Sequence, residues 1–205
     1  MPQRLTREES QAVTRGRLLE AGSEVFAEKG FYGASVEEIA ERAGYTRGAF
    51  YSNFADKAEL FLALIDQRTE QSIEEISAIL RDASSPEAAL EGIRRRDFSR
   101  PLDRSWFLLS TEFRLYALRN AKVRPKLVAR ERQIRKAFTR AVTAQLSALG
   151  VPPPASPEHL GLIVQALDDG LWMHRQRDPA GVPADLLVDT LELLLRASVA
   201  LAPGG

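Results

Sequence analysis

The 205-residue sequence contains no cysteine and only two histidines. Without cysteine, neither a disulfide framework nor a thiolate metal site can form. The sequence also lacks a glycine-rich phosphate loop, a G-x-S-x-G nucleophile motif and the Glu-x-x-His pairs of di-iron helical bundles. Asp168 and Asp169 are adjacent in a predicted helix, so their carboxylates point in different directions and make a poor general acid and base pair. We therefore expect no enzyme, no metal and no cofactor.

Long apolar runs are absent as well. No stretch approaches the roughly 18 apolar residues typical of a membrane-spanning helix. The opening MPQRLTREESQ is polar and lacks the apolar core of a signal peptide. We therefore expect a cytoplasmic protein with no membrane partner. Its 44% hydrophobic content can bury a substantial core, and its length fits one large domain or a small module fused to a bigger one.

The formal net charge is zero, because 28 basic residues balance 28 acidic ones, but the two signs are unevenly distributed. Residues 94–140 hold 15 basic and 4 acidic side chains, whereas residues 58–93 hold 2 and 8. The first 57 residues hold 8 and 9, so they are not basic overall. Three interpretations of the basic segment stay open: a solvated face paired with acidic neighbours, a helper surface for phosphates, or the wall of an anionic ligand's pocket.

Strand signals are almost absent, because apolar residues recur at spacings of three and four over most of the chain. This pattern predicts an all-α fold of about nine helices. The first is expected to stop at Gly30. Capping residues predict the starts of four others, namely Ser35, Thr46, Asp56 and the pair Ser156-Pro157. The fifth helix is expected to start at SSPEAA, the sixth to span residues 102–119 and the seventh to span residues 122–149. The ninth is expected to end near Ala202.

The second and third predicted helices form a helix-turn-helix unit. Gly44 lies in the turn between them, where it suits a left-handed conformation. Glu38 and Glu59 follow the caps of the second and fourth helices by three residues, which predicts two capping boxes. We place a helix-turn-helix domain at residues 1–57 and a larger helical domain at residues 58–205.

Residues 13–62 resemble the DNA-binding domain of the TetR (tetracycline-repressor) family. The resemblance is carried by LLEAGSEVFAEKGF and SVEEIAERAGYTRGAFYSNFADKAEL, in which Ile39-Ala40, Ala43-Gly44, Phe50-Tyr51, Phe54 and Lys57 stand at family spacing. It implies a sequence-specific DNA-binding transcriptional regulator, with a larger domain that binds an effector and dimerises. Family tendency favours repression, although activation stays open. The alternatives are a helical protein-interaction module and a regulator that needs no effector.

The third helix carries the residues expected to read the bases. Arg47, in its first turn, can make the bidentate contact to guanine that supplies most base discrimination. Gly48 leaves room for the backbone to approach the groove, and Ala49 can lie against a thymine methyl group. The nearby Phe50 and Phe54 are assigned to the small core beneath this helix.

Other residues are expected to fix the orientation on DNA through phosphate oxygens. They are Tyr45, Thr46, Tyr51 and Asn53, together with Ser35 and Lys57 at the starts of flanking helices, where backbone amides also favour an anion. The resemblance implies this role for Tyr51 and Lys57 in particular. The alternative is structural, with Ser35 and Thr46 as caps only, Tyr51 as a packing residue and Lys57 as a solvated charge.

Because the first 57 residues are not basic, we expect weak nonspecific DNA binding. Affinity should then depend on geometry, on dimerisation and on the arginines near the N-terminus, which are Arg4, Arg7, Arg15 and Arg17. The segment PQRLTR is either an arm that reaches a minor groove or a disordered tail.

Two apolar stripes near the C-terminus predict a homodimer through residues 157–202. The stripes run over Leu160, Ile163, Val164, Leu167 and Leu171, and over Leu187, Leu191, Leu194, Ser198 and Leu201. Small residues at Ala166 and Gly170 permit close approach of helices. The alternative is packing within one chain. A two-fold dimer would match a palindromic operator in double-stranded DNA, with half-sites about 34–36 Å apart or more.

The sixth predicted helix carries an aromatic stripe of Trp106, Phe113 and Tyr116. Such a stripe is either ordinary core or the wall of an effector site. We assign these three residues and Trp172 to effector binding, following the resemblance, with a small-molecule ligand that is apolar or aromatic and possibly anionic. The effector would favour a dimer whose recognition helices are wrongly spaced for DNA, with the fourth helix as the lever.

Overall fold

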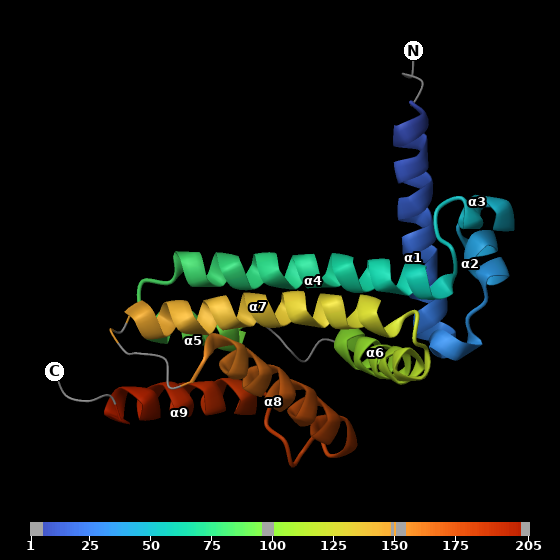
Figure 1. Cartoon of the computed structure of the whole chain (residues 1–205). Helices are drawn as coiled ribbons and strands as arrows, with labels where there is room; N and C mark the ends of the chain where they lie inside the picture. Colours follow the sequence, from blue (N-terminus) through green and yellow to red (C-terminus); the bar gives the residue numbers. More distant parts are fainter. Residues whose placement is uncertain (1–5, 96–100, 149, 151–154, 202–205) are drawn as a thin grey trace. The chain divides into compact units, whose positions relative to one another are not determined.

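The computed structural model describes residues 6–95, 101–148, 150 and 155–201. These residues form nine α-helices and no strand (Figure 1), which confirms the predicted all-α fold. The helices are α1 (Arg7–Gly33), α2 (Val36–Arg42), α3 (Arg47–Tyr51), α4 (Lys57–Asp82), α5 (Pro86–Arg95), α6 (Pro101–Arg119), α7 (Arg124–Ala148), α8 (Pro157–Arg177) and α9 (Leu186–Leu201). In the described part of the chain, none of the helices has both the length and the apolar character needed to cross a membrane.

Helix α1 extends beyond its predicted end at Gly30. It begins after Thr6, whose hydroxyl accepts a hydrogen bond from the Glu9 amide while the Glu9 carboxylate accepts one from the Thr6 amide. At the other end the chain does not stop at Gly30 but kinks there, with φ 70° and ψ 174°, and makes one further turn to Gly33. A backbone of this shape is open essentially to glycine alone.

The chain packs as two compact units. The first unit comprises Met1–Arg68 and Ser105–Val128, and the second comprises Thr69–Arg104 and Ala129–Gly205. Most of α6 therefore belongs to the same unit as α1, α2 and α3. The sequence analysis instead divides the chain by function, into a helix-turn-helix domain at residues 1–57 and a larger helical domain at residues 58–205. That division stays a prediction.

Aromatic side chains hold the first unit together. Phe61 of α4 packs edge to face against Phe26 of α1, with ring centroids 5.3 Å apart, and lies 4.4 Å from Phe113 of α6. Phe31, just after the kink, meets Phe113 edge to face at 5.0 Å. These four rings are at most 1% exposed. Ring pairs of this kind stabilise a core beyond the area that they bury, so α1, α4 and α6 form a firm base for the short helices α2 and α3.

The second unit combines ion pairs with close helix packing. Arg94 of α5 lies 2.6 Å from Asp189 and 3.4 Å from Glu192, both on α9. Gly161 of α8 lies so close to Thr139 of α7 that a Cβ there would come within 2.0 Å of the threonine hydroxyl oxygen. At Arg94, therefore, the basic segment is paired with acidic neighbours, as one of its three interpretations expects.

Candidate nucleic-acid interface

Helix α2 is positioned by its N-terminal cap. The Ser35 hydroxyl accepts a hydrogen bond from the Glu38 amide at 3.2 Å, as predicted. The Glu38 carboxylate pairs with Lys29 of α1, so the predicted return bond of a capping box is replaced by a contact between helices. Ile39 and Ala40 are almost fully buried and anchor the inner face of α2.

The turn between α2 and α3 depends on glycine. Gly44 has φ 76°, the left-handed conformation that the sequence predicts for it. The next amide, that of Tyr45, donates to the Ala40 carbonyl at 2.8 Å and so closes the end of α2. This tight closure sets α3 directly beside α2, as Figure 1 shows.

Helix α3 has a buried side and an exposed side. Thr46 caps it, because its hydroxyl accepts from the Ala49 amide at 3.2 Å. Phe50 is fully buried, and Phe54, just beyond the helix, is 1% exposed. Arg47, Gly48 and Tyr51 are exposed, the last at 47%, whereas Tyr45 and Ala49 are half-buried. The predicted core residues thus hold a short helix whose polar face is open to a partner.

Arg47 is held in a defined direction by two neighbours. Its NH1 lies 2.6 Å from Oε1 of Glu37 on α2, and its NH2 lies 3.4 Å from the Tyr51 hydroxyl. The hydrogen bond to Tyr51 and the charge of Glu37 raise the pKa of the Arg47 guanidinium. The sequence predicts a role for Arg47, but it gave no indication of Glu37, which is one of several glutamates in the first 57 residues.

Lys57, at the first position of α4, reaches back to the last turn of α1 and to Ala34, which follows it. Its ammonium donates to the carbonyls of Phe31 at 2.8 Å, Tyr32 at 3.2 Å and Ala34 at 2.7 Å. Burial lowers the pKa of Lys57. The three carbonyl acceptors favour the charged form, and a lysine has only three such donors. The predicted phosphate contact would therefore compete with bonds inside the protein.

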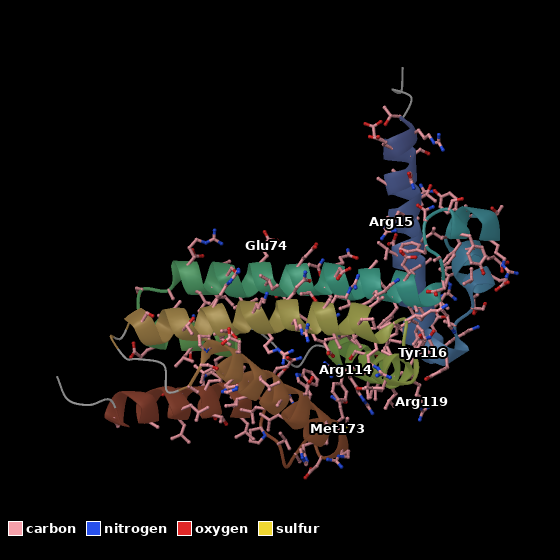
Figure 2. All side chains as sticks on the ribbon, viewed as in Figure 1. Arg15, Glu74, Arg114, Tyr116, Arg119 and Met173 are labelled. Atoms are coloured by element: carbon pink, nitrogen blue, oxygen red, sulfur yellow. The ribbon has the colours of Figure 1, made fainter. Side chains whose placement is uncertain are left out.

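Asn53 and Arg15 are also tied to the protein. The Asn53 side-chain amide donates to the Ala49 carbonyl at 2.8 Å, and its backbone carbonyl accepts from Arg15 NH1 at 2.9 Å. The guanidinium carbon of Arg15, which Figure 2 labels on α1, lies 4.1 Å from the centre of the Phe54 ring. Arg15 therefore joins α1 to the residues that directly follow α3. Arg4, in the predicted arm, lies outside the described residues.

The residues assigned to an effector fall into both units. Phe113 is fully buried among the aromatic rings of the first unit, and Tyr116 lies 4.8 Å from Phe31. Trp106 stacks on Phe61 at 5.5 Å. Trp172 lies on α8 in the second unit, where it is half-buried. The three α6 residues thus form part of the core that supports the helix-turn-helix.

The sequence matches two family models. Residues 18–64 match the model of bacterial regulatory proteins of the tetR family, and residues 86–200, more than half of the chain, match the C-terminal model of BetI-type transcriptional repressors. Both models describe regulatory proteins rather than enzymes, in agreement with the prediction from sequence.

Named transcriptional regulators are similar to the N-terminal region of this chain. The transcriptional activator FasR of Mycolicibacterium smegmatis is 39% identical over 67 residues, and the transcriptional regulator TtgR of Pseudomonas putida is 45% identical over 67 residues. Each match covers 33% of this chain and 31% of the relative. The similarity to these proteins therefore spans less than a third of their length.

Solved structures resemble nearly the whole chain. A regulator from Saccharomonospora viridis in complex with choline has a TM-score of 0.69 at 18% identity, over 91% of this chain and 96% of that one. FadR from Bacillus subtilis, in complex with stearoyl-CoA, has a TM-score of 0.61 at 17% identity, over 90% and 97%. At these identities the likeness establishes the fold. Together with the two family models, it leads to one conclusion: the chain belongs to the TetR family of bacterial transcriptional regulators.

Proposed function

We propose that this protein is a repressor that binds operator DNA through the exposed face of α3. The observation that carries the proposal is the division of that helix, in which Phe50 is fully buried while Arg47 and Tyr51 project outward. A recognition helix needs this arrangement, because its first residues must reach base edges in the major groove. The repressor assignment is supported by the C-terminal family match at residues 86–200. Such a regulator would act in the cytoplasm.

The proposed contacts divide into two kinds. Arg47 reads a guanine, with Gly48 and Ala49 allowing close approach to the groove. Ser35, Tyr45, Thr46 and Tyr51 are assigned to phosphates, which fix the orientation of the helix. A phosphate contact by Lys57 would require one of its three present hydrogen bonds to break, whereas the side-chain amide of Asn53 has a second N–H beside the one bound to Ala49.

The protein is proposed to bind DNA as a homodimer through residues 157–202. Large apolar side chains of α8 and α9 are exposed in the single chain, namely Leu162, Ile163, Met173, Leu193 and Leu194. Such exposure on two helices favours a partner surface. The side chains of Ser198 and Leu201, at the end of the predicted stripe, lie outside the described residues.

An apolar or aromatic effector is proposed to release the operator. Phe113 touches Phe31, which directly follows the α1 kink, so a ligand that inserts among the rings of α6 would disturb the base of the helix-turn-helix. The effector role of Trp172, which lies in the second unit, stays a prediction from sequence. The choline and stearoyl-CoA complexes of two structural neighbours support small-molecule binding in this fold, without naming the ligand of this chain.

A footprint on the DNA upstream of the protein's own gene tests the proposal. We expect two protected half-sites related by symmetry, with centres about 34–36 Å apart or a multiple of that. Arg47→Ala should relax the choice of one base pair in each half-site, typically by about 1–3 kcal/mol of discrimination. Equal binding of the wild-type protein to the upstream duplex and to unrelated duplexes would overturn the proposal.

A further inference from the structure

Glu37 and Arg47 form an ion pair between the two helices of the helix-turn-helix. Glu37 Oε1 lies 2.6 Å from Arg47 NH1. The guanidinium carbon of Arg47 also lies 5.5 Å from the centre of the Tyr51 ring. The arginine is thus held between a carboxylate of α2 and an aromatic ring of its own helix.

The local sequence brings the two first turns together. Ser35 caps α2, so Glu37 is the second residue of that helix. Thr46 caps α3, so Arg47 is its first residue. Because Gly44 closes the turn with φ 76°, the starts of both helices are close enough for the two side chains to meet.

Both partners remain largely in water, with 61% of the Arg47 side chain and 59% of the Glu37 side chain exposed. An ion pair with this exposure contributes little to folding stability. A guanidinium has five N–H donors in a rigid fork, so bonds on the side of Glu37 and Tyr51 leave further donors for another acceptor. The pair therefore fits a role in directing Arg47 better than a role in holding the fold.

We propose that Glu37 is a positioning residue that sharpens base recognition by Arg47, an inference that rests on the proposed DNA-binding function. A guanidinium already held in one direction loses less conformational entropy when it binds guanine. The carboxylate also competes with the phosphates, to which a free arginine would turn and which carry no sequence information. Glu37 thus lowers affinity for duplexes that lack the guanine and raises the preference for the correct base pair.

The test measures the affinity of full-length variants for two kinds of duplex. One is the footprinted operator, and the other is the same operator with one G·C pair replaced, namely the pair whose recognition Arg47→Ala relaxes. In Glu37→Gln the preference for the operator should fall by roughly fivefold, a part of what a bidentate arginine supplies. The affinity of Glu37→Gln for the duplexes with the replaced base pair should rise. Glu41→Gln is the matched control, because it removes the same charge from an exposed residue one turn further along α2. It should leave the preference unchanged.

Two further variants separate position from charge. Glu37→Asp keeps the charge but shortens the reach by one methylene group, so it should lose preference without gaining affinity for the replaced duplexes. In an Arg47→Ala background, Glu37→Gln should no longer change the preference, because the group that it positions is gone. Glu37→Asp also serves as the test if Glu37→Gln fails to fold.

The outcomes distinguish the inference from the function on which it rests. A wild-type protein that shows no preference among these duplexes contradicts the proposed function itself. A wild-type protein with a clear preference that Glu37→Gln and Glu37→Asp both retain overturns the role of Glu37 alone. So does an effect of Glu37→Gln that persists unchanged without Arg47.

Discussion

The backbone amide of Phe31 donates a hydrogen bond to the Glu112 carboxylate, 2.8 Å away in space and 81 positions away in sequence. The bond joins α6 to the residue that follows the Gly30 kink of α1. Lys57 of α4 donates to the carbonyls of Phe31, Tyr32 and Ala34 in the same segment. Two helices, α4 and α6, therefore bind one short segment at the end of α1, and its geometry decides how α1 leads into α2.

Gly30→Ala should destabilise the protein. The substitution places a side chain in a backbone region that non-glycine residues occupy at a cost of about 1–3 kcal/mol. Its Cβ would also lie 2.7 Å from a carboxylate oxygen of Glu112. Urea unfolding should show the loss. Gly16→Ala is the control, since nothing lies within 4 Å of its Cβ and alanine favours a helix by about 0.5–1 kcal/mol. If the two variants have the same free energy of unfolding, the backbone at Gly30 accepts a side chain without cost and the prediction is wrong.

Glu112→Ala should leave the Phe31 amide without its acceptor. An unpaired, partly buried donor costs about 1–3 kcal/mol, so the free energy of unfolding should fall by that order. Glu112→Gln retains a side-chain oxygen that can accept the bond, and it should lose much less. Thermal unfolding of both variants measures the difference. If glutamine proves as damaging as alanine, the charge of Glu112 matters rather than its bond to Phe31.

Lys57→Met should lower the free energy of unfolding by about 1–2 kcal/mol, because three carbonyls lose a charged donor while the apolar stem is kept. Chemical denaturation is the measurement. Lys122→Met, an exposed lysine in the same unit, is the control and should change little.

DNA binding by the same variant separates two roles of Lys57. A lysine that contacts a phosphate reduces the slope of log affinity against log salt by about one when it is removed. The sequence predicts such a contact. Since the ammonium already uses its three donors on carbonyls, we expect the slope to stay the same. A reduced slope with unchanged stability would restore the phosphate contact and contradict the structural role.

Local signals in the sequence were enough to predict most of the helix-turn-helix. Ser35 and Thr46 cap their helices, and Gly44 takes the left-handed conformation, because each depends only on residues within a few positions. The capping box of Thr6 and Glu9 rests on a local signal of the same kind, the pattern T-x-x-E. At α4 the Glu59 amide bonds to Asp56 as predicted, whereas the Glu59 carboxylate binds the Ala55 amide instead of that of Asp56.

Contacts between distant residues could not be predicted in this way. Nothing near Glu112 in the sequence indicates that it accepts a hydrogen bond from the Phe31 amide. The ion pair of Glu37 with Arg47 depends on how closely the turn folds. Likewise, the spacing of the α6 aromatic stripe fits core and ligand site equally well, and the structure places Phe113 fully inside the core. Such roles follow from tertiary packing, which the spacing along a single helix leaves undetermined.

Leu193→Glu should separate the proposed dimer into monomers without unfolding the chain. Leu193 is 66% exposed on α9, so glutamate there can remain in water in a single chain, whereas in a dimer through residues 157–202 it would bury an unpaired charge. Sedimentation should then give the mass of one chain, and operator affinity should fall because each half-site is bound alone.

Leu118→Glu is the matched control, since Leu118 is 62% exposed on α6, outside the proposed interface. A Leu193→Glu variant that sediments with the mass of two chains would place the interface elsewhere. Loss of the dimer in both variants would show that the effect is not specific to α9.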